Sequence, residues 1–371
     1  MTGLESAGLE SAHLEFARDD IPGRVVFGVG SRRLVPAEAD RWNAERILVV
    51  ASPAEDVLAT ELTDLLGGRV VGRFSDVVQH VPIAKAQDAR SMVRDTAADL
   101  VLTVGGGSAT GFGKAISLEI DIVHIAVPTT YAGSEMTTIW GLTDGDHKLT
   151  GKDARVKPDV VVYDPELTLS LAPSIAGPSG MNALAHCVEA LYGPGADPIT
   201  SVLALEGIRT LAASLPTVCR DPDDIDARTV ALFGAHLAGM SLATGGTALH
   251  HKTCHVLGGM FDLNHGDMNA VVLGHALAYN APAIPDIMAR LSAVLQIDDA
   301  AGAMFDLAVA IGAPTDLASI GMPEDGLDEA ARRVVVDAAA NVRPPEFAGI
   351  RSMLDDAFHG RRPAAGTTGV T

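Results

Sequence analysis

Residues Asp99–Ser108 have the sequence DLVLTVGGGS, in which an apolar run of strand length leads directly into three glycines and a serine. A continuous apolar run is typical of a parallel strand that is covered on both faces. Glycines after such a strand let the backbone approach a ligand closely, and the start of the next helix favours an anion such as a pyrophosphate. The stretch predicts a nucleotide-binding parallel sheet, and an ordinary tight turn is the simpler alternative.

Strand-like and helix-like segments alternate on both sides of this stretch, which indicates an α/β fold with a doubly wound parallel sheet. The expected strands are 24–30, 46–52, 69–74, 99–104, 121–130 and 159–165, and helices are expected at 53–66, at 83–97 and from 112 onward. Beyond residue 171 the helical patterns are 181–191, 199–215, 224–240, 249–258, 268–279, 285–294 and 298–312.

This change of character predicts two domains. We expect an α/β dinucleotide-binding domain over residues 13–175 and an all-helical catalytic domain over residues 176–362. Residues 1–12, which contain GLESA twice, and residues 363–371 are expected to be flexible tails.

The composition excludes several classes of partner. The 371 residues carry a formal net charge of −20, and aromatic residues make up only 4%. A nucleic-acid partner and an anionic membrane surface are therefore not expected. The N-terminus lacks the basic and apolar segments of a signal peptide, and no apolar run reaches the length of a membrane span, so we expect a cytoplasmic protein.

Three loops are expected at the carboxyl edge of the sheet, where nucleotides bind in this architecture. The expected contacts to an NADH or NADPH cofactor are Gly105, Gly106, Gly107, Ser108, Ser52, Thr129, Thr130, Ser134 and Lys148. No acid directly follows the strand at 46–52. Because such an acid would repel a 2′-phosphate, its absence leaves both cofactors open. For Lys148, a solvated hairpin is an equal alternative.

Five of the twelve histidines lie between Thr247 and Asn280. His251 and His255 are four residues apart, so a helix places them on one face. We expect that helix to end at Gly258 and Gly259.

A second pair with the same spacing, Asn182 and His186, precedes this segment, and His265 follows it. Two helices and a turn can bring His186, His251 and His265 to one point, with Asn182 and His255 beside it. The alternative is that these histidines are structural, which four of them at this spacing make the weaker interpretation.

Together these motifs resemble the iron-containing alcohol dehydrogenase family over about residues 13–363. The matching segments are Gly105–Ser108, Pro128–Glu135, Asn182–His186 and His251–Gly266. Within the family, the segments Ser179–His186 (SGMNALAH) and Pro128–Gly141 (PTTYAGSEMTTIWG) are similar to the maleylacetate reductase branch. The resemblance implies an α/β domain followed by an all-helical domain, and a homodimer.

The implied reaction is the NAD(P)H-dependent reduction of the C=C bond of 2-maleylacetate, a small dicarboxylate, to 3-oxoadipate in the breakdown of aromatic compounds. In the family, the residues that match Asn182, His186, His251 and His265 hold a divalent metal. Metal-dependent members have Asp where this chain has Asn182, and a further acid where it has Gly111. Because an amide is a poor ligand for a transition metal, we expect no catalytic metal.

Without a metal, imidazolium groups are expected to stabilise a developing enolate and to make a locally positive pocket. His251 and His265 are the expected oxyanion-binding and proton-donating groups. His186 and His255 are expected to orient or relay, and Asn182 to form a hydrogen bond. Two further residues, Tyr131 and Lys252, are expected to bind substrate.

Two alternatives remain at this point. One is a metal-dependent alcohol dehydrogenase of the same fold that uses iron or zinc at His186, His251 and His265. The other is a non-catalytic nucleotide-binding protein.

Overall fold

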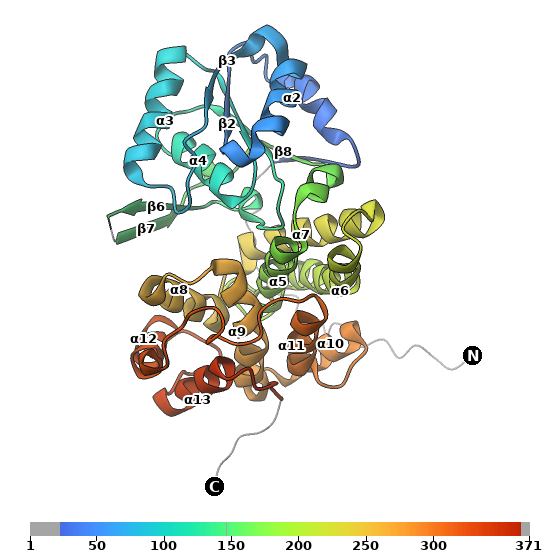
Figure 1. Ribbon diagram of the computed structural model, residues 1–371, viewed down its shortest axis with the longest axis vertical. Helices are drawn as coiled ribbons and strands as arrows, with labels where there is room; N and C mark the ends of the chain where they lie inside the picture. Colours follow the sequence, from blue (N-terminus) through green and yellow to red (C-terminus); the bar gives the residue numbers. More distant parts are fainter. Residues whose placement is uncertain (1–22, 146, 365–371) are drawn as a thin grey trace, which may run out of the picture.

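The computed structural model describes residues 23–145 and 147–364, so the predictions for residues 1–12 and for most of the C-terminal tail lie outside the described residues. The N-terminal half contains a six-stranded parallel sheet in the order β1-β8-β5-β4-β2-β3 (Figure 1). Its strands are β1 (Arg24–Phe27), β2 (Ile47–Ala51), β3 (Val70–Phe74), β4 (Leu100–Val104), β5 (Val123–Val127) and β8 (Val160–Tyr163).

Both faces of the sheet are covered, as the apolar strands predicted. In β2, Ile47 and Val49 belong to one buried core, and Leu48 and Val50 belong to the core on the opposite face. Helices α1 (Val35–Arg41) and α2 (Asp56–Leu66) contribute to the first core, and α3 (Ile83–Thr96) and α4 (Gly107–Ser117) contribute to the second. This arrangement confirms the doubly wound α/β prediction.

The strand order places a crevice between β2 and β4. The chain runs from β2 outward to β3 and then returns to β4 on the other side of β2. Loops that leave neighbouring strands at such a reversal diverge, and ligands bind there in open α/β sheets. The glycine loop follows β4, and Ser52 follows β2.

An antiparallel hairpin of β6 (Ile139–Asp144) and β7 (His147–Lys152) extends from this half beside the helical half (Figure 1). It contains Lys148, whose side chain is exposed. The single-turn or two-turn 3₁₀ helices are Ser31–Leu34, Pro53–Glu55, Gly67–Arg69, Ser134–Met136, Ala154–Val156, Pro165–Ser170, Ala281–Ala283 and Glu324–Gly326.

Within the described residues, the regular secondary structure of the C-terminal half consists of helices. Its helices are α5 (Pro173–Ala190), α6 (Pro198–Arg220), α7 (Ile225–Gly245), α8 (Leu249–Phe261), α9 (His265–Asn280), α10 (Pro285–Leu295), α11 (Ala300–Ala310), α12 (Leu327–Asp337) and α13 (Phe347–Phe358). Helix α9 contributes side chains to two buried cores, one with α5, α6 and α7 and the other with α8, α12 and α13. It therefore joins the two groups of helices.

The glycine- and proline-rich stretch before residue 181 is helical, although the sequence predicted a helix only from 181. Helix α5 begins at Pro173 and passes through Pro178. A Cβ atom on Gly180 would lie 2.3 Å from Leu215, and one on Gly177 would lie 3.4 Å from Cys219. The glycines therefore allow α6 to pack closely against α5, and they do not form a loop.

Helix α8 is longer than predicted, because Gly258 and Gly259 do not end it. It continues to Phe261 and ends where Asp262 adopts a left-handed conformation with φ of 53°. The side chain of Asn264 then accepts hydrogen bonds from the first turn of α9. Helices α12 and α13 were not predicted.

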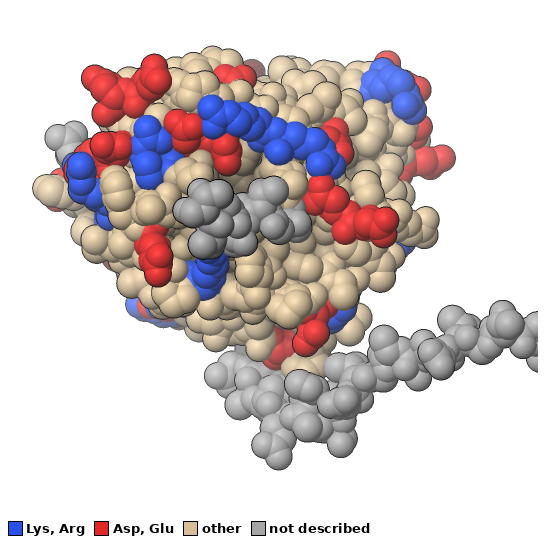
Figure 2. All heavy atoms as spheres, turned by 90° about the horizontal axis from the view of Figure 1, so that it is seen from below, with Lys and Arg blue, Asp and Glu red and all other residues tan. Residues whose placement is uncertain are grey.

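The helix α6 is long and apolar enough, by length and composition alone, to cross a membrane. Its residues Ala204, Ile208, Leu211 and Leu215 are buried in the helical core, which accounts for that composition. On the face formed by the C-terminal helices, acidic and basic side chains are interspersed (Figure 2). Arg351 pairs there with Asp328 at 2.8 Å.

Candidate functional site

The α5 helix presents three polar side chains on one buried face. Asn182, His186 and Glu189 are spaced by four and three residues, and their exposed fractions are 7%, 5% and 0%. Opposite them, the start of α8 carries His250 and His251, which are also buried. Sequence reasoning missed Glu189 and His250 as members of this group.

Four of the predicted histidines come together in a chain of neighbouring rings. The ring of His186 lies 4.7 Å from that of His251, measured between centroids. The corresponding distance is 6.4 Å from His251 to His255 and 6.5 Å from His255 to His265. His186 and His251 are buried, whereas His255 and His265 are exposed, so the chain runs from the interior to the surface.

The histidines of this cluster have lowered pKa values in the free protein, so they bind a proton less readily than an ordinary histidine. Burial, followed by the neighbouring histidines, holds the pKa of His186 and of His251 well below the ordinary value. The pKa values of His255 and His265 are lowered by desolvation and then by Lys148, although solvent contact weakens the effect for these exposed rings. In the free protein these rings are therefore mostly neutral, and a positive pocket requires something that raises their pKa values.

Polar atoms of the cluster lack partners. The Oδ1 atom of Asn182, the Nδ1 atom of His186 and the Nε2 atom of His251 are buried and accept or donate no hydrogen bond within the described part of the chain. Buried polar atoms are nearly always satisfied in proteins, so such atoms mark a place where a ligand or water completes the set.

A cavity of about 340 Å³ lies at the crevice between β2 and β4. It is lined by Ser52, Val77, Val78, Gln79, Gly105, Gly106, Gly107, Ser108, Ala109 and Thr130. Six of the predicted cofactor contacts are among these residues. The predicted contacts Thr129, Ser134 and Lys148 do not line the cavity.

The glycine loop is shaped for close approach of a ligand. Gly105 has φ of 135°, which other residues rarely adopt, and a Cβ on Gly106 would lie 2.9 Å from Thr130. Helix α4 begins at Gly107, five residues earlier than predicted, and its first turn has no side-chain cap. The free N–H groups of that turn therefore face the cavity edge, where they favour an anion.

One acid lies beside the glycine loop, although none directly follows β2. The hydroxyl of Thr129 donates a hydrogen bond of 2.8 Å to Oε1 of Glu55, which explains why Thr129 does not line the cavity. The side chain of Glu55 also packs against Gly105, since a Cβ there would lie 3.4 Å from its Cγ atom. Glu55 stands four residues beyond the strand, in a 3₁₀ turn that returns it to the loop.

The absence of a side chain at Gly111 has a steric cause. A Cβ on Gly111 would lie 2.8 Å from the Cγ2 atom of Val81. Val81 and His80 have φ of 46° and 64°, a strained conformation for a β-branched residue such as valine. The backbone N–H of Thr143 donates to the carbonyl of Val81 and its hydroxyl donates to that of His80, which holds this strained loop against α4.

Tyr131 is not placed to bind substrate. It is fully buried in the helical core, and burial raises the pKa of its hydroxyl although Arg228 beside it opposes that shift. Lys252 and Lys148 lie closer to the chemistry, because both act electrostatically on His255. Lys148 is exposed on β7, and its charge also lowers the pKa of His265.

Comparison with known proteins agrees with this arrangement. Residues 22–165 match the model of the iron-containing alcohol dehydrogenases, and residues 177–358 match that of the C-terminal part of the Fe-containing alcohol dehydrogenase family. A maleylacetate reductase of Sphingobium indicum is 46% identical over 94% of this chain and 99% of its own length. One of Burkholderia cepacia is 44% identical over 92% of this chain and 97% of its own length.

Solved structures show the same relationship. The crystal structure of a maleylacetate reductase from Agrobacterium tumefaciens superposes with a TM-score of 0.91 at 42% identity, covering 94% of this chain and 99% of that one. A sulfoacetaldehyde reductase from Bifidobacterium kashiwanohense, solved with NAD⁺, shares only the fold, with a TM-score of 0.86 at 22% identity over 92% of this chain and 99% of that one. The predicted fold and resemblance are confirmed, and the chain belongs to the iron-containing alcohol dehydrogenase family.

Proposed function

We propose that this chain is a maleylacetate reductase that uses NADH and works without a catalytic metal. The observation that carries the proposal is a glycine-lined crevice beside a buried cluster of imidazoles and one amide, in a chain whose named relatives reduce maleylacetate. The crevice suits a dinucleotide, because a side chain at Gly106 would fill it and the uncapped start of α4 favours a pyrophosphate.

The donor set does not suit the iron after which the family is named. Asn182 supplies a neutral amide, and the histidines beside it are neutral as well. The nearest carboxylate, Glu189, is already bound by the backbone of His250 and the ring of His251. Three neutral imidazoles can still bind zinc, but the amide of Asn182 is a poor ligand for a transition metal and replaces the acid of the metal-dependent members, so we derive no step through a metal.

The chemistry needs a hydride and a proton. NADH supplies the hydride, which adds to the C=C carbon in conjugation with the ketone and leaves an enolate. A proton then goes to the adjacent carbon, so that maleylacetate, NADH and one proton yield 3-oxoadipate and NAD⁺. His251 and His265 remain our candidates for stabilising the enolate oxygen and delivering that proton.

Binding of the substrate prepares these groups. Maleylacetate carries two carboxylates, and a nearby dianion raises the pKa of a histidine. The exposed rings of His255 and His265 can take a proton from solvent more readily than the buried rings. Lys148 and Lys252 add positive charge beside them. The positive pocket is thus formed on binding in a protein whose net charge is −20.

Glu55 favours NADH over NADPH. Its carboxylate lies beside Gly105 at the crevice, where a 2′-phosphate would meet like charge. The same carboxylate does not repel the 2′-hydroxyl of NADH, because that group is neutral.

We further infer a cytoplasmic homodimer. Strand β1 is an edge strand, and apolar side chains beside it are exposed, among them Phe27 at 37% and Phe233 at 39%. The centroids of their rings lie 6.1 Å apart. Val29 and Val230, which are near them in the sequence, are also exposed. An open sheet edge with an apolar border is normally covered.

The test is the oxidation of NADH in the presence of maleylacetate, by protein of measured metal content, with and without a chelator. We expect turnover at negligible metal content that chelation does not change. Activity that falls with chelation and returns with iron or zinc would contradict the metal-free mechanism and favour the metal-dependent alternative. Absence of turnover in both conditions would contradict the proposal that maleylacetate is the substrate.

A further inference from the structure

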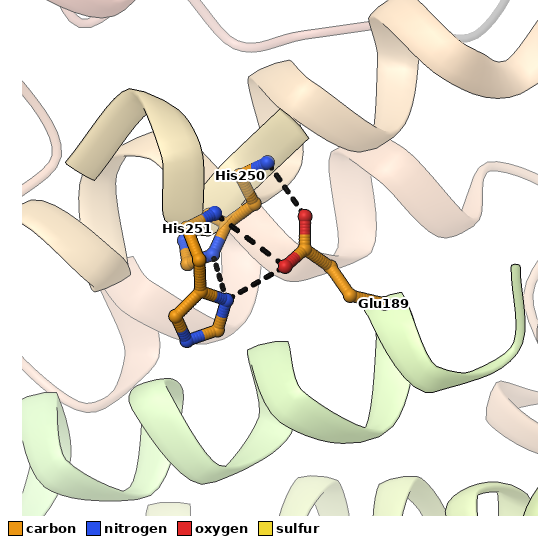
Figure 3. A group of neighbouring side chains, drawn as sticks. All are labelled: Glu189, His250 and His251. Atoms are coloured by element: carbon orange, nitrogen blue, oxygen red, sulfur yellow. Dashed lines mark hydrogen bonds and ion pairs between the residues drawn. The ribbon is translucent and has the colours of Figure 1, made fainter. Parts of the chain in front are cut away.

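The carboxylate of Glu189 is fully buried and accepts three hydrogen bonds from one short segment (Figure 3). Its Oε1 atom accepts from the backbone N–H of His250 at 2.6 Å. Its Oε2 atom accepts from the backbone N–H of His251 at 3.4 Å and lies 2.7 Å from Nδ1 of the same ring. All three contacts cross from α5 to the start of α8.

A buried carboxylate such as that of Glu189 is not needed merely to cap the N-terminus of α8. Helix α8 has no side-chain cap of its own, since Ala248 stands at its N-cap. The helices α7, α9 and α11 are each capped by a local Asp or Asn that is not buried. Burial raises the pKa of Glu189, which shows that its charge is costly here. The contact with the ring of His251 is what a local cap could not provide.

The hydrogen bonds of His250 determine which nitrogen of His251 carries the proton. The Nε2 atom of His250 lies 3.1 Å from the carbonyl oxygen of Asn269, which can only accept, so this nitrogen carries hydrogen. In the neutral ring, Nδ1 of His250 is then an acceptor, and it lies 3.2 Å from Nδ1 of His251. Glu189 and His250 thus present two acceptors to the same nitrogen of His251, which must carry hydrogen.

We propose that Glu189 is a positioning residue that holds His251 in the tautomer with hydrogen on Nδ1 and directs the lone pair of Nε2 into the site. That Nε2 atom is buried and has no partner among the described residues. A carboxylate that accepts from Nδ1 fixes both the tautomer and the orientation of the imidazole. The mechanistic consequence rests on the proposed function of His251, but the tautomer does not.

A bound cation is the competing explanation. One ligand atom from each of Glu189, His250 and His251 lies within 4.8 Å of the others, close enough to share a metal ion. However, the 2.7 Å contact between Glu189 and His251 is a good hydrogen bond, and a cation would have to displace its proton. We therefore favour the hydrogen-bonded network, and the experiment below uses protein shown to be metal-free.

The decisive variant is Glu189→Gln. We expect the amide oxygen to take the place of Oε1 and accept the short 2.6 Å bond from the N–H of His250, so that the NH₂ group faces Nδ1 of His251 and makes it an acceptor. This forces hydrogen onto Nε2, the wrong tautomer, while the shape of the side chain is kept. We expect kcat for maleylacetate reduction to fall by about 10²- to 10⁴-fold, with the KM for NADH changed less than about twofold. Glu189→Asp should retain part of the activity.

The matched control is Glu38→Gln. Glu38 is also buried and hydrogen-bonded, to Arg24 at 2.7 Å, but it lies on α1, away from the histidines. This control is expected to keep kcat within about twofold, because it loses a buried charge without touching His251.

The tautomer is read directly from protein carrying ¹⁵N-labelled histidine, with His251→Gln to assign the signals. The wild type should show hydrogen on Nδ1 of His251, and Glu189→Gln should show it on Nε2. A wild-type Nε2–H tautomer would overturn the proposal. So would loss of activity in Glu189→Gln without a change of tautomer, because that would indicate a merely structural role. If the wild type does not reduce maleylacetate, the spectra alone decide the role of Glu189.

Discussion

The imidazole ring of His186 stacks on that of His251, with centroids 4.7 Å apart and planes inclined by 15°. Both rings are buried, so a charge on one makes charging of the other more costly. At most one of the two is therefore expected to be protonated during turnover. Because Glu189 is hydrogen-bonded to His251, this ring is the better candidate.

Replacement of His251 should separate chemistry from cofactor binding. In His251→Ala, we expect kcat to fall by about 10²-fold or more, since a positioned acid–base group typically contributes that much. The Kd for NADH should stay within about twofold, because the cavity is lined by residues of the N-terminal half. Steady-state kinetics measure kcat, and fluorescence titration measures the Kd for NADH. An unchanged kcat would remove His251 from the mechanism.

Neutralising Glu55 should change the choice of cofactor. In Glu55→Gln, we expect the ratio of kcat/KM for NADPH to that for NADH to rise by about tenfold, which corresponds to about 1.4 kcal/mol of removed repulsion. Gln keeps an acceptor for the hydroxyl of Thr129, so the loop should retain its shape. Thr129→Val is the control, because it breaks the same contact and keeps the carboxylate. An equal rise in both variants would indicate a disturbed loop.

Filling the contact between α5 and α6 should destabilise the helical half. A methyl group at Gly180 would lie 2.3 Å from Cδ2 of Leu215, so we expect Gly180→Ala to lower the free energy of unfolding by roughly 1–3 kcal/mol. Gly259→Ala is the matched control, because this helical glycine has nothing within 4 Å of its added Cβ. That control should gain about 0.5–1 kcal/mol. Denaturant unfolding measures both, and equal effects would contradict the packing argument.

Features encoded by local pattern were predictable from the sequence. The runs at β2 and β4 are apolar because both faces of the sheet are covered, and a strand buried in this way has no other sequence signature. The i,i+4 pairs, Asn182 with His186 and His251 with His255, lie on helix faces as their spacing required. The local pattern gave a wrong start for α5, because glycines such as Gly180 allow a neighbouring helix to pack closely and do not form a loop.

Contacts between distant segments were not predictable. Glu189 meets His251 across 62 residues, and Glu55 meets Thr129 across 74 residues, so neither pairing has a local signature. A partial signal existed for Glu189, since it follows His186 by three residues on the same helix face. Tyr131 lies in a motif beside the glycine crevice, but the direction of its side chain is set by packing against α5 and α7.

The buried neutral histidines outside the cluster should make stability depend on pH. Burial lowers the pKa of His124 to about 3, and that of His236 and His275 to about 4, from an ordinary value of 6.5. Between these values and 6.5, the unfolded chain binds protons that the folded chain does not. Stability is therefore full above about pH 6.5 and is lost as the pH falls below it.

His275→Leu tests this linkage. The Nε2 atom of His275 has no hydrogen-bond partner within the described ranges, and the ring packs edge-on against Phe305, so an apolar replacement forfeits no described bond to that atom. Each such histidine contributes up to about 1.4 kcal/mol per pH unit to the slope of unfolding free energy against pH. We expect a smaller slope between pH 6 and 5 in His275→Leu, corresponding to the uptake of about one proton fewer, or less than that, on unfolding. Urea unfolding at several pH values measures it, and an unchanged slope would mean that His275 takes up its proton equally in the folded and the unfolded chain.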